Sequence, residues 1–165
     1  MPLITTERLT LRPLQRDDAT VLHAWLSDPK VMRYWSTLPH QEMDETIRWV
    51  ELSLTEMAAG RAHDHAVLLK ERMIGRVTFW QGDEIGFFFD PLFWGKGYAR
   101  EALTAFCRYG FQKLGFAEIR ADVDPDNAAS LRVLERVGFQ RTGFAEKTLE
   151  IGGTWFDSVY LALKR

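Results

Sequence analysis

The sequence predicts a single domain, residues 1–165, of α+β (mixed α/β) class, with about seven strands and about four helices. Three observations support this prediction. In some segments apolar residues alternate with polar ones, which is typical of strands, and in others they recur every three or four residues, which is typical of helices. No repeat, low-complexity tract or linker divides the chain. The two kinds of segment are also interspersed, which favours one mixed sheet over separate all-α and all-β parts.

The first third of the chain predicts one strand and two helices. Residues 8–14 alternate leucines with polar or charged residues, as a half-buried strand does. Residues 19–28 then have apolar residues at helical spacing after two aspartates that suit an N-cap, and Pro29 marks the end of that helix. A second helix is expected over 42–59, with acidic residues in its first turn and Gly60 as its stop.

The middle of the chain predicts an antiparallel meander. The segment HAVLLKERMIGRVTFW, residues 65–80, reads as two strands around a turn at Glu71–Arg72. The segment QGDEIGFFFD, residues 81–90, adds a third strand across a turn at Gly82–Asp83.

The last third predicts two helices and three strands. A helix is expected over 98–114, a strand over 118–124 and a short helix over 127–137, which the following glycine ends. Two closing strands, 140–150 and 155–163, surround the turn IGGT.

The composition excludes several classes of function. Hydrophobic residues make up 46% of the chain, charged residues 27%, and the formal net charge is −2, so no basic face for nucleic acid is evident. The N-terminus lacks the apolar run of a signal peptide, and no segment is long enough to span a bilayer, so we expect a cytoplasmic protein with no membrane attachment. Cys107 is the only cysteine, which excludes a disulfide framework and a thiolate metal cluster.

The tripeptide Gly95-Lys96-Gly97 indicates an anion site. It lies where a predicted strand passes directly into a helix, whose first backbone N–H groups and positive dipole end point at one place. Glycines there remove the β-carbons that would keep a phosphate from the amides, and Lys96 adds a positive charge. Two glycines also suit a sharp turn with no ligand.

Two common nucleotide-binding motifs do not match this loop. A P-loop requires four residues between its first glycine and a Gly-Lys-Ser/Thr end, which the chain lacks. A dinucleotide fingerprint requires a third glycine, and Arg100 stands at that position.

The segment FWGKGYAREAL resembles motif A of the GNAT superfamily of acyl-coenzyme A N-acyltransferases. That motif has Gln or Arg, then a glycine three residues later and Gly or Ala two residues after it; here Trp94, Gly97 and Ala99 take these positions. The aromatic first residue is similar to the RimJ/RimL branch, the ribosomal-protein N-terminal acetyltransferases. The segments TTERLTLRPL, DPKVMRYW and DPDNAASLRVLERVGFQRTG also resemble that branch, so the resemblance covers nearly the whole chain.

The resemblance implies the GNAT fold, a central twisted and mostly antiparallel sheet of about seven strands that splays in the middle, with about four flanking helices. It also implies that loop amides hold the pyrophosphate of acetyl-CoA and that freed strand amides hold the pantetheine arm and thioester carbonyl. The implied cofactor-binding residues are Phe87, Phe88, Phe89, Trp94, Gly95, Lys96, Gly97, Tyr98, Ala99, Arg100, Asn127 and Ser130.

Two residues of the later motif have implied roles at the coenzyme. Asn127 would contact it, although an asparagine at the start of a helix is also typical of an N-cap. Ser130, one helical turn further on, would lie near the sulfur and assist the leaving thiolate. Many GNAT enzymes use a tyrosine seven residues after this asparagine, and here that position is Leu134.

A general base would help because most amines are protonated at neutral pH. A lysine amine is less than about 0.1% neutral at pH 7, whereas about 10–20% of an α-amine is neutral. Three carboxylates are candidates, in the order Glu150, Asp122 and Glu84; the resemblance favours the first, and each is also typical of a solvated surface charge.

The resulting hypothesis is transfer of an acetyl group from acetyl-CoA to a primary amine by direct attack in a ternary complex. A protein N-terminal α-amine is the first choice of acceptor, and a small amine such as an amino acid, polyamine or antibiotic is the alternative. A non-catalytic acyl-CoA sensor is an alternative of another class. Trp25, Trp35 and Trp49 belong to the region that covers the acceptor side in this family, and Trp35 in particular is a candidate for the acceptor pocket. A homodimer is expected by analogy with this family.

No metal is expected. His63 and His65 share a strand face but have no third ligand at a recognisable spacing, so a role at a strand edge is the better interpretation. The segment DVDPDN lacks the glycine and closing glutamate of a calcium loop.

Overall fold

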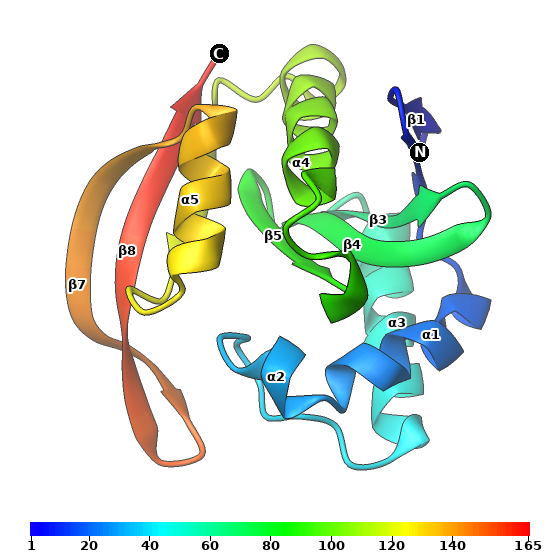
Figure 1. Cartoon of the computed structure of the whole chain (residues 1–165), viewed down its shortest axis with the longest axis horizontal. Coiled ribbons are helices and arrows are strands. Elements are labelled where there is room, and N and C mark those ends of the chain that lie inside the picture. The colour runs from blue at the N-terminus through cyan, green and yellow to red at the C-terminus, as the bar shows by residue number, and fades with distance from the viewer.

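The computed structural model describes residues 1–165 and contains a single eight-stranded sheet (Figure 1). The order of strands across the sheet is β1-β2-β3-β4-β5-β6-β8-β7. All neighbours are antiparallel except β5 and β6. The strands are β1 Ile4–Thr5, β2 Leu9–Pro13, β3 Ala62–Leu69, β4 Arg72–Trp80, β5 Glu84–Phe89, β6 Glu118–Val123, β7 Gln140–Ile151 and β8 Thr154–Lys164.

Helices cover both faces of the sheet. The α-helices are α1 Ala19–Leu26, α2 Pro29–Met32, α3 Met43–Ala58, α4 Tyr98–Tyr109 and α5 Ala128–Val137. Short 3-10 turns precede α1 and α4, and a π-helical turn, Gly110–Leu114, extends α4. None of these helices combines the length and the apolar character that crossing a bilayer requires.

The two faces of the sheet have separate apolar cores. Helices α4 and α5, which lie next to each other in Figure 1, bury residues such as Leu103, Phe106 and Leu134 in the larger core. Helices α1 and α3 bury residues such as Leu22 and Val50 in the smaller core on the opposite face. Each helix has apolar residues on one side only, so it covers the sheet with that side and exposes its charged residues.

The sheet divides between β5 and β6. These parallel strands are paired only at Glu84 and Arg120, where the Arg120 amide donates to the Asp83 carbonyl at 3.0 Å. Beyond that point β5 stays paired with β4, and β6 stays paired with β8 along its whole length. The fold therefore consists of two antiparallel halves that diverge from one shared bridge.

The structure confirms the predicted fold class and adds two short elements. The eighth strand, β1, has only two residues, too few for an alternating pattern. Helix α1 ends at Leu26, and Pro29 does not end that helix but occupies the first turn of α2, where its missing N–H costs nothing.

The prediction that His63 and His65 have a role at a strand edge is wrong for His65, which lies between β2 and β4, whereas His63 lies beyond the end of the pairing with β2. His65 is fully buried against the rings of Phe106 and Tyr109, and burial lowers its pKa to about 4, so its imidazole is neutral at physiological pH. No three His, Cys, Asp or Glu side chains are grouped so that they could hold a metal ion.

Candidate functional site

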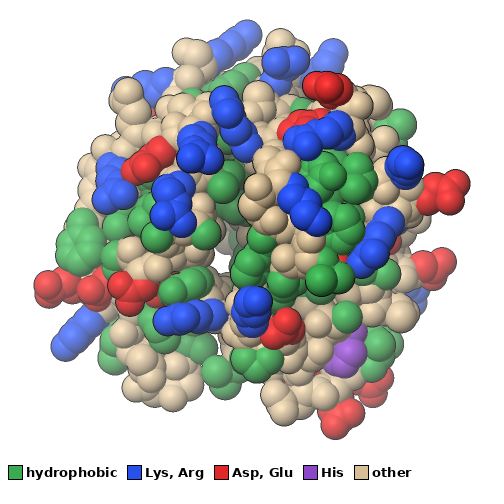
Figure 2. All heavy atoms as spheres, in the orientation of Figure 1, with side chains coloured by type: hydrophobic (Ala, Val, Ile, Leu, Met, Phe, Trp, Pro, Cys, Tyr) green, Lys and Arg blue, Asp and Glu red, His purple; other side chains and the backbone are tan.

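A large cleft of about 1270 Å³ lies where the two halves of the sheet diverge. It is lined by the loop before α4, the N-terminal part of α5, the exposed edge of β5, the end of β6 and residues of α2, α3, β7 and β8. Figure 2 shows that this face of the molecule is hollowed at its centre and that Lys and Arg side chains gather around the hollow. The basic side chains that line the cleft are Lys30, Arg33, Arg76, Lys96, Arg100 and Arg136.

The loop before α4 presents six consecutive backbone amides. None of the N–H groups of residues 95–100 donates a hydrogen bond within the protein. An ordinary helix N-terminus leaves four such donors, and here the left-handed backbone of Gly95 (φ 73°) and Gly97 (φ 81°) extends the series. With the positive end of α4 behind them, these amides suit the phosphate groups of a ligand.

A partly exposed network holds this loop to the turn between β1 and β2. Glu101, in the first turn of α4, accepts hydrogen bonds from the Thr6 hydroxyl (2.6 Å) and from the Arg8 amide (2.9 Å) and Nε (2.6 Å). Partial burial of the Glu101 carboxylate opposes its ionisation, but these hydrogen bonds outweigh that effect and lower its pKa. Arg8 also donates to the Lys96 carbonyl at 3.2 Å, so it fixes the position of the loop. The sequence analysis missed this role of Arg8 and Glu101.

The exposed edge of β5 provides further amides. The Asp90 amide donates to Ile74 of β4, and the alternation of an antiparallel ladder then directs the Phe88 amide toward β4 and the Phe87 and Phe89 amides toward the gap. In the gap, the Phe89 carbonyl accepts a hydrogen bond from Trp94 Nε1 at 2.8 Å. Trp94 thus replaces β6 as the donor to this carbonyl.

The residues of α5 meet the cleft from the other side. The Asn127 side-chain oxygen accepts from the Ser130 backbone amide at 3.1 Å, so Asn127 is the N-cap of α5, while its side-chain nitrogen Nδ2 has no partner within the protein. Ser130 is half-buried and its hydroxyl has no partner in the protein. Leu134, where many relatives have tyrosine, is fully buried at the base of the cleft.

Two of the three candidate bases lie in the cleft. Partial burial raises the pKa of Glu84, and the negative charge of the neighbouring Asp122 raises it further. Glu150 does not line the cleft: it is exposed on β7, opposite Trp155 of β8. Every other residue that the sequence analysis assigned to the coenzyme or to catalysis does line it.

One face of the β4–β5 hairpin forms a wall of the cleft that the sequence analysis did not identify. The cross-strand pairs on that face are Arg76 with Phe88, Thr78 with Gly86 and Trp80 with Glu84, and all six residues line the cleft. Arg76 interrupts the apolar segment MIGRVTFW, and a charge inside a buried strand was the signal available in the sequence.

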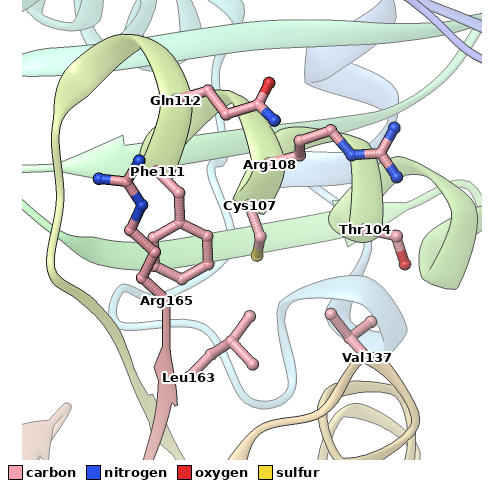
Figure 3. Close-up of a pocket in the computed structure, with 8 residues that line it drawn as sticks. All are labelled: Thr104, Cys107, Arg108, Phe111, Gln112, Val137, Leu163 and Arg165. Atoms are coloured by element: carbon pink, nitrogen blue, oxygen red, sulfur yellow. The ribbon is translucent and has the colours of Figure 1, made fainter.

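A second pocket, of about 340 Å³, contains the only cysteine (Figure 3). It lies between the end of α4 and the C-terminus of the chain, with Arg108 and Arg165 at its rim. Burial raises the pKa of Cys107 to about 12, so its thiol is protonated and is a poor nucleophile at neutral pH. This pocket therefore offers no covalent chemistry.

Comparisons with known proteins agree with the fold and with the cleft between the two halves of the sheet. The model of the acetyltransferase (GNAT) domain family matches residues 8–140. The uncharacterized N-acetyltransferase YnaD of Bacillus subtilis is 32% identical over 97% of this chain and 95% of its own. A GNAT-family acetyltransferase from Bacillus anthracis is 29% identical, with a TM-score of 0.86 over 99% of this chain and 98% of that one. An acetyltransferase from Salmonella typhimurium has the same fold, at 20% identity, with a TM-score of 0.91 over 99% of each chain.

The chain belongs to the GNAT acetyltransferase family. It is an acyl-CoA-dependent N-acetyltransferase, and acetyl-CoA is its cosubstrate. The cleft fits that ligand, because six unpaired amides and several basic side chains suit its phosphates and the β5 edge offers amides to its arm.

The buried thiol gives a first prediction. Because only about one Cys107 thiol in ten thousand is ionised at pH 8, we expect no labelling by a disulfide reagent in the folded protein and full labelling after unfolding. The Cys107→Ala variant should keep its acetyl-transfer rate within about twofold. Rapid labelling of the folded protein, or loss of turnover in the variant, would contradict the assignment of Cys107 to packing.

Proposed function

We propose that the acceptor of the acetyl group is the N-terminal α-amine of a polypeptide. The observation that supports this proposal is the continuation of the cleft past the β5–β6 gap along the β4–β5 face, where Trp35, Trp49 and Trp80 line it. At about 1270 Å³ the cleft exceeds the roughly 300–1,000 Å³ of a typical small-molecule site, so it has room for the coenzyme arm and a peptide end together.

The residues of the cleft have the following proposed roles. The amides of residues 95–100 and the Asn127 side chain hold the coenzyme, whose thioester supplies the activated acetyl group. The Phe87 or Phe89 amide donates to the acetyl oxygen, where negative charge develops, an effect worth about 3 kcal/mol per donor. The amine nitrogen bonds to the acetyl carbon as the carbon–sulfur bond breaks. Its proton passes to Glu84, directly or through Asp122 or water, and Ser130 donates to the departing thiolate.

An acceptor α-amine suits these groups better than a lysine does. About a tenth or more of such amines are neutral at pH 7, so a carboxylate of raised pKa, such as Glu84, is a sufficient base. The solved Salmonella relative is described as modifying the N-terminal serine of ribosomal protein L7/L12. A spermidine acetyltransferase from Vibrio cholerae has the same fold, so the fold alone does not choose between acceptors. A cytoplasmic location and a homodimer stay predictions.

An acceptor screen tests the proposal. Free-thiol release from acetyl-CoA should be at least about tenfold faster with unblocked peptides than with the same peptides N-terminally blocked but carrying a free lysine. The rate of thiol release with unblocked peptides should also exceed the rate with spermidine. Equal rates with blocked peptides, or a preference for spermidine, would overturn the choice of acceptor and leave the acetyltransferase activity standing.

A pair of glycine substitutions, one in the loop before α4 and one outside the cleft, tests whether that loop binds the coenzyme. The Gly97→Leu change puts a side chain beside the free amides, so we expect acetyl-CoA to bind at least about tenfold more weakly by calorimetry. Gly115→Leu is the matched control, because Gly115 has a similar left-handed φ of 76° and open space around it but lies outside the cleft. Both variants carry a comparable backbone strain of about 1–2 kcal/mol. Equal affinities in the two variants would refute the loop assignment.

The pH profile of turnover tests the base. We expect Glu84→Gln to lower kcat by about 10²-fold or more, and Glu150→Gln, outside the cleft, to change it less than about twofold. Because the charge of Asp122 raises the pKa of Glu84, Asp122→Asn should shift the acidic limb of the kcat profile to lower pH. If Asp122→Asn is inactive and Glu84→Gln is not, the base is Asp122 instead.

A further inference from the structure

Arg76 is the most deeply buried cation of the cleft, with a relative exposure of 2%. Its Nε and Nη2 donate to both carboxylate oxygens of Asp64, the first at 2.7 Å, in a bidentate pair. Asp64 is fully buried behind it and does not line the cleft, whereas Arg76 does. The pair as a whole is neutral, and its positive end faces the cleft.

The third nitrogen of this guanidinium, Nη1, is buried and has no hydrogen-bond partner. A buried unpaired donor is rare in proteins and costs stability, because the group has lost its hydrogen bonds to water. Aromatic rings fix the guanidinium in place: its central carbon lies 4.5 Å from the Trp49 ring centre, 5.7 Å from that of Phe88 and 5.9 Å from that of Trp35. The guanidinium is thus held in a set position, and Arg76 is one of the residues that line the cleft.

A second unpaired polar group lies on the same face of β4. The Thr78 hydroxyl is buried, with the residue 3% exposed, and it too has no partner. Thr78 lies opposite Gly86, and a β-carbon at Gly86 would come within 3.3 Å of Thr78 and 3.7 Å of the Trp35 ring. Arg76, Thr78, Trp35 and Trp49 thus form one small compartment, which we name the Arg76 compartment.

The Arg76 compartment adjoins the place proposed for the thioester. Arg76 is paired across the strands with Phe88, whose neighbours Phe87 and Phe89 direct their amides into the gap. Adjacent strands lie about 4.8 Å apart. A ligand oxygen on Nη1 and an amine at the gap can therefore belong to one small acceptor molecule. An acceptor whose amine lies at the gap would therefore place its neighbouring group at the compartment.

We propose that the Arg76 compartment binds the neutral amide group next to the acceptor amine, as found at a peptide N-terminus, with the carbonyl oxygen on Arg76 Nη1 and the Thr78 hydroxyl as a second hydrogen-bond partner. This inference rests on the proposed acetyl transfer to an amine in this cleft. An amide carbonyl gives Nη1 an acceptor and adds no charge to a pair that Asp64 already neutralises. A protonated polyamine has only hydrogen-bond donors and positive charges. It would leave Nη1 without an acceptor and would place a positive charge beside the Arg76 guanidinium.

The test compares two acceptors that differ in this group. Alaninamide has an amide next to the amine, and sec-butylamine has an ethyl group of similar size in its place. The variants are Thr78→Val, which removes one hydroxyl and leaves the Arg76–Asp64 pair intact, and Arg76→Lys, which keeps the charge but removes Nη1. Thr10→Val, in strand β2 outside the cleft, is the matched control.

We expect each cleft variant to lower kcat/KM for alaninamide at least about tenfold, mainly through KM, and to change the value for sec-butylamine less than about threefold. The variant-to-wild-type ratio removes the difference in basicity between the two amines. Calorimetric affinity for coenzyme A should be unchanged in all three variants, which shows that the fold is intact. Equal losses with both acceptors, or no loss with either, would overturn the inference.

A binding measurement separates this inference from the proposed function. Alaninamide is titrated into protein saturated with coenzyme A, and the indole N–H signals of Trp35 and Trp49 are followed by NMR. Weaker binding to Thr78→Val than to the wild type supports the compartment even if no acceptor is acetylated, in which case the proposed function fails alone. Equal binding to both proteins overturns the compartment whatever the turnover.

Discussion

The pairing of β5 with β6 through a single bridge is the constraint on which the site depends. If the two strands continued as a parallel ladder, the amides of Phe87 and Phe89 would be used by β6, and the sheet would have no opening. Because β6 instead follows β8 along its whole length, the two halves of the sheet diverge beyond the single bridge. Backbone N–H groups that are normally hydrogen-bonded between strands are therefore free to bind a ligand.

Trp94 and the Arg8–Glu101 pair stabilise this open arrangement. The Trp94 indole supplies the hydrogen bond that the Phe89 carbonyl would otherwise receive from a neighbouring strand. Glu101 ties the first turn of α4 to Arg8, in the turn before β2, and so fixes the loop whose six amides face the cleft. The departure of Trp94 from the Gln or Arg of the wider family pattern thus has a structural explanation. In the proposed mechanism, the coenzyme binds groups that are already oriented before it arrives.

Local signals predicted the fold and the loop of free amides before α4, whereas the proposed acceptor side depends on contacts between distant segments. Glycines at Gly95 and Gly97 and a helix start are local features, so the loop could be found in the sequence. The side of β7 on which Glu150 lies could not be predicted from the sequence. The reason is that β7 has register shifts after Arg141 and after Ala145, which break the alternation of its side chains. The compartment at Arg76 also depends on Asp64 of the neighbouring strand and on tryptophans of the N-terminal helices, which no spacing reveals.

The most direct test of this account is an amide NMR titration of the protein with coenzyme A. The largest changes in N–H signals should fall on residues 95–100 and on Phe87 and Phe89, while the Phe88 amide, which the ladder directs toward β4, changes little. Changes centred on the pocket around Cys107, with the signals of residues 95–100 unmoved, would contradict the claim that the divergence of β5 and β6 creates the coenzyme site.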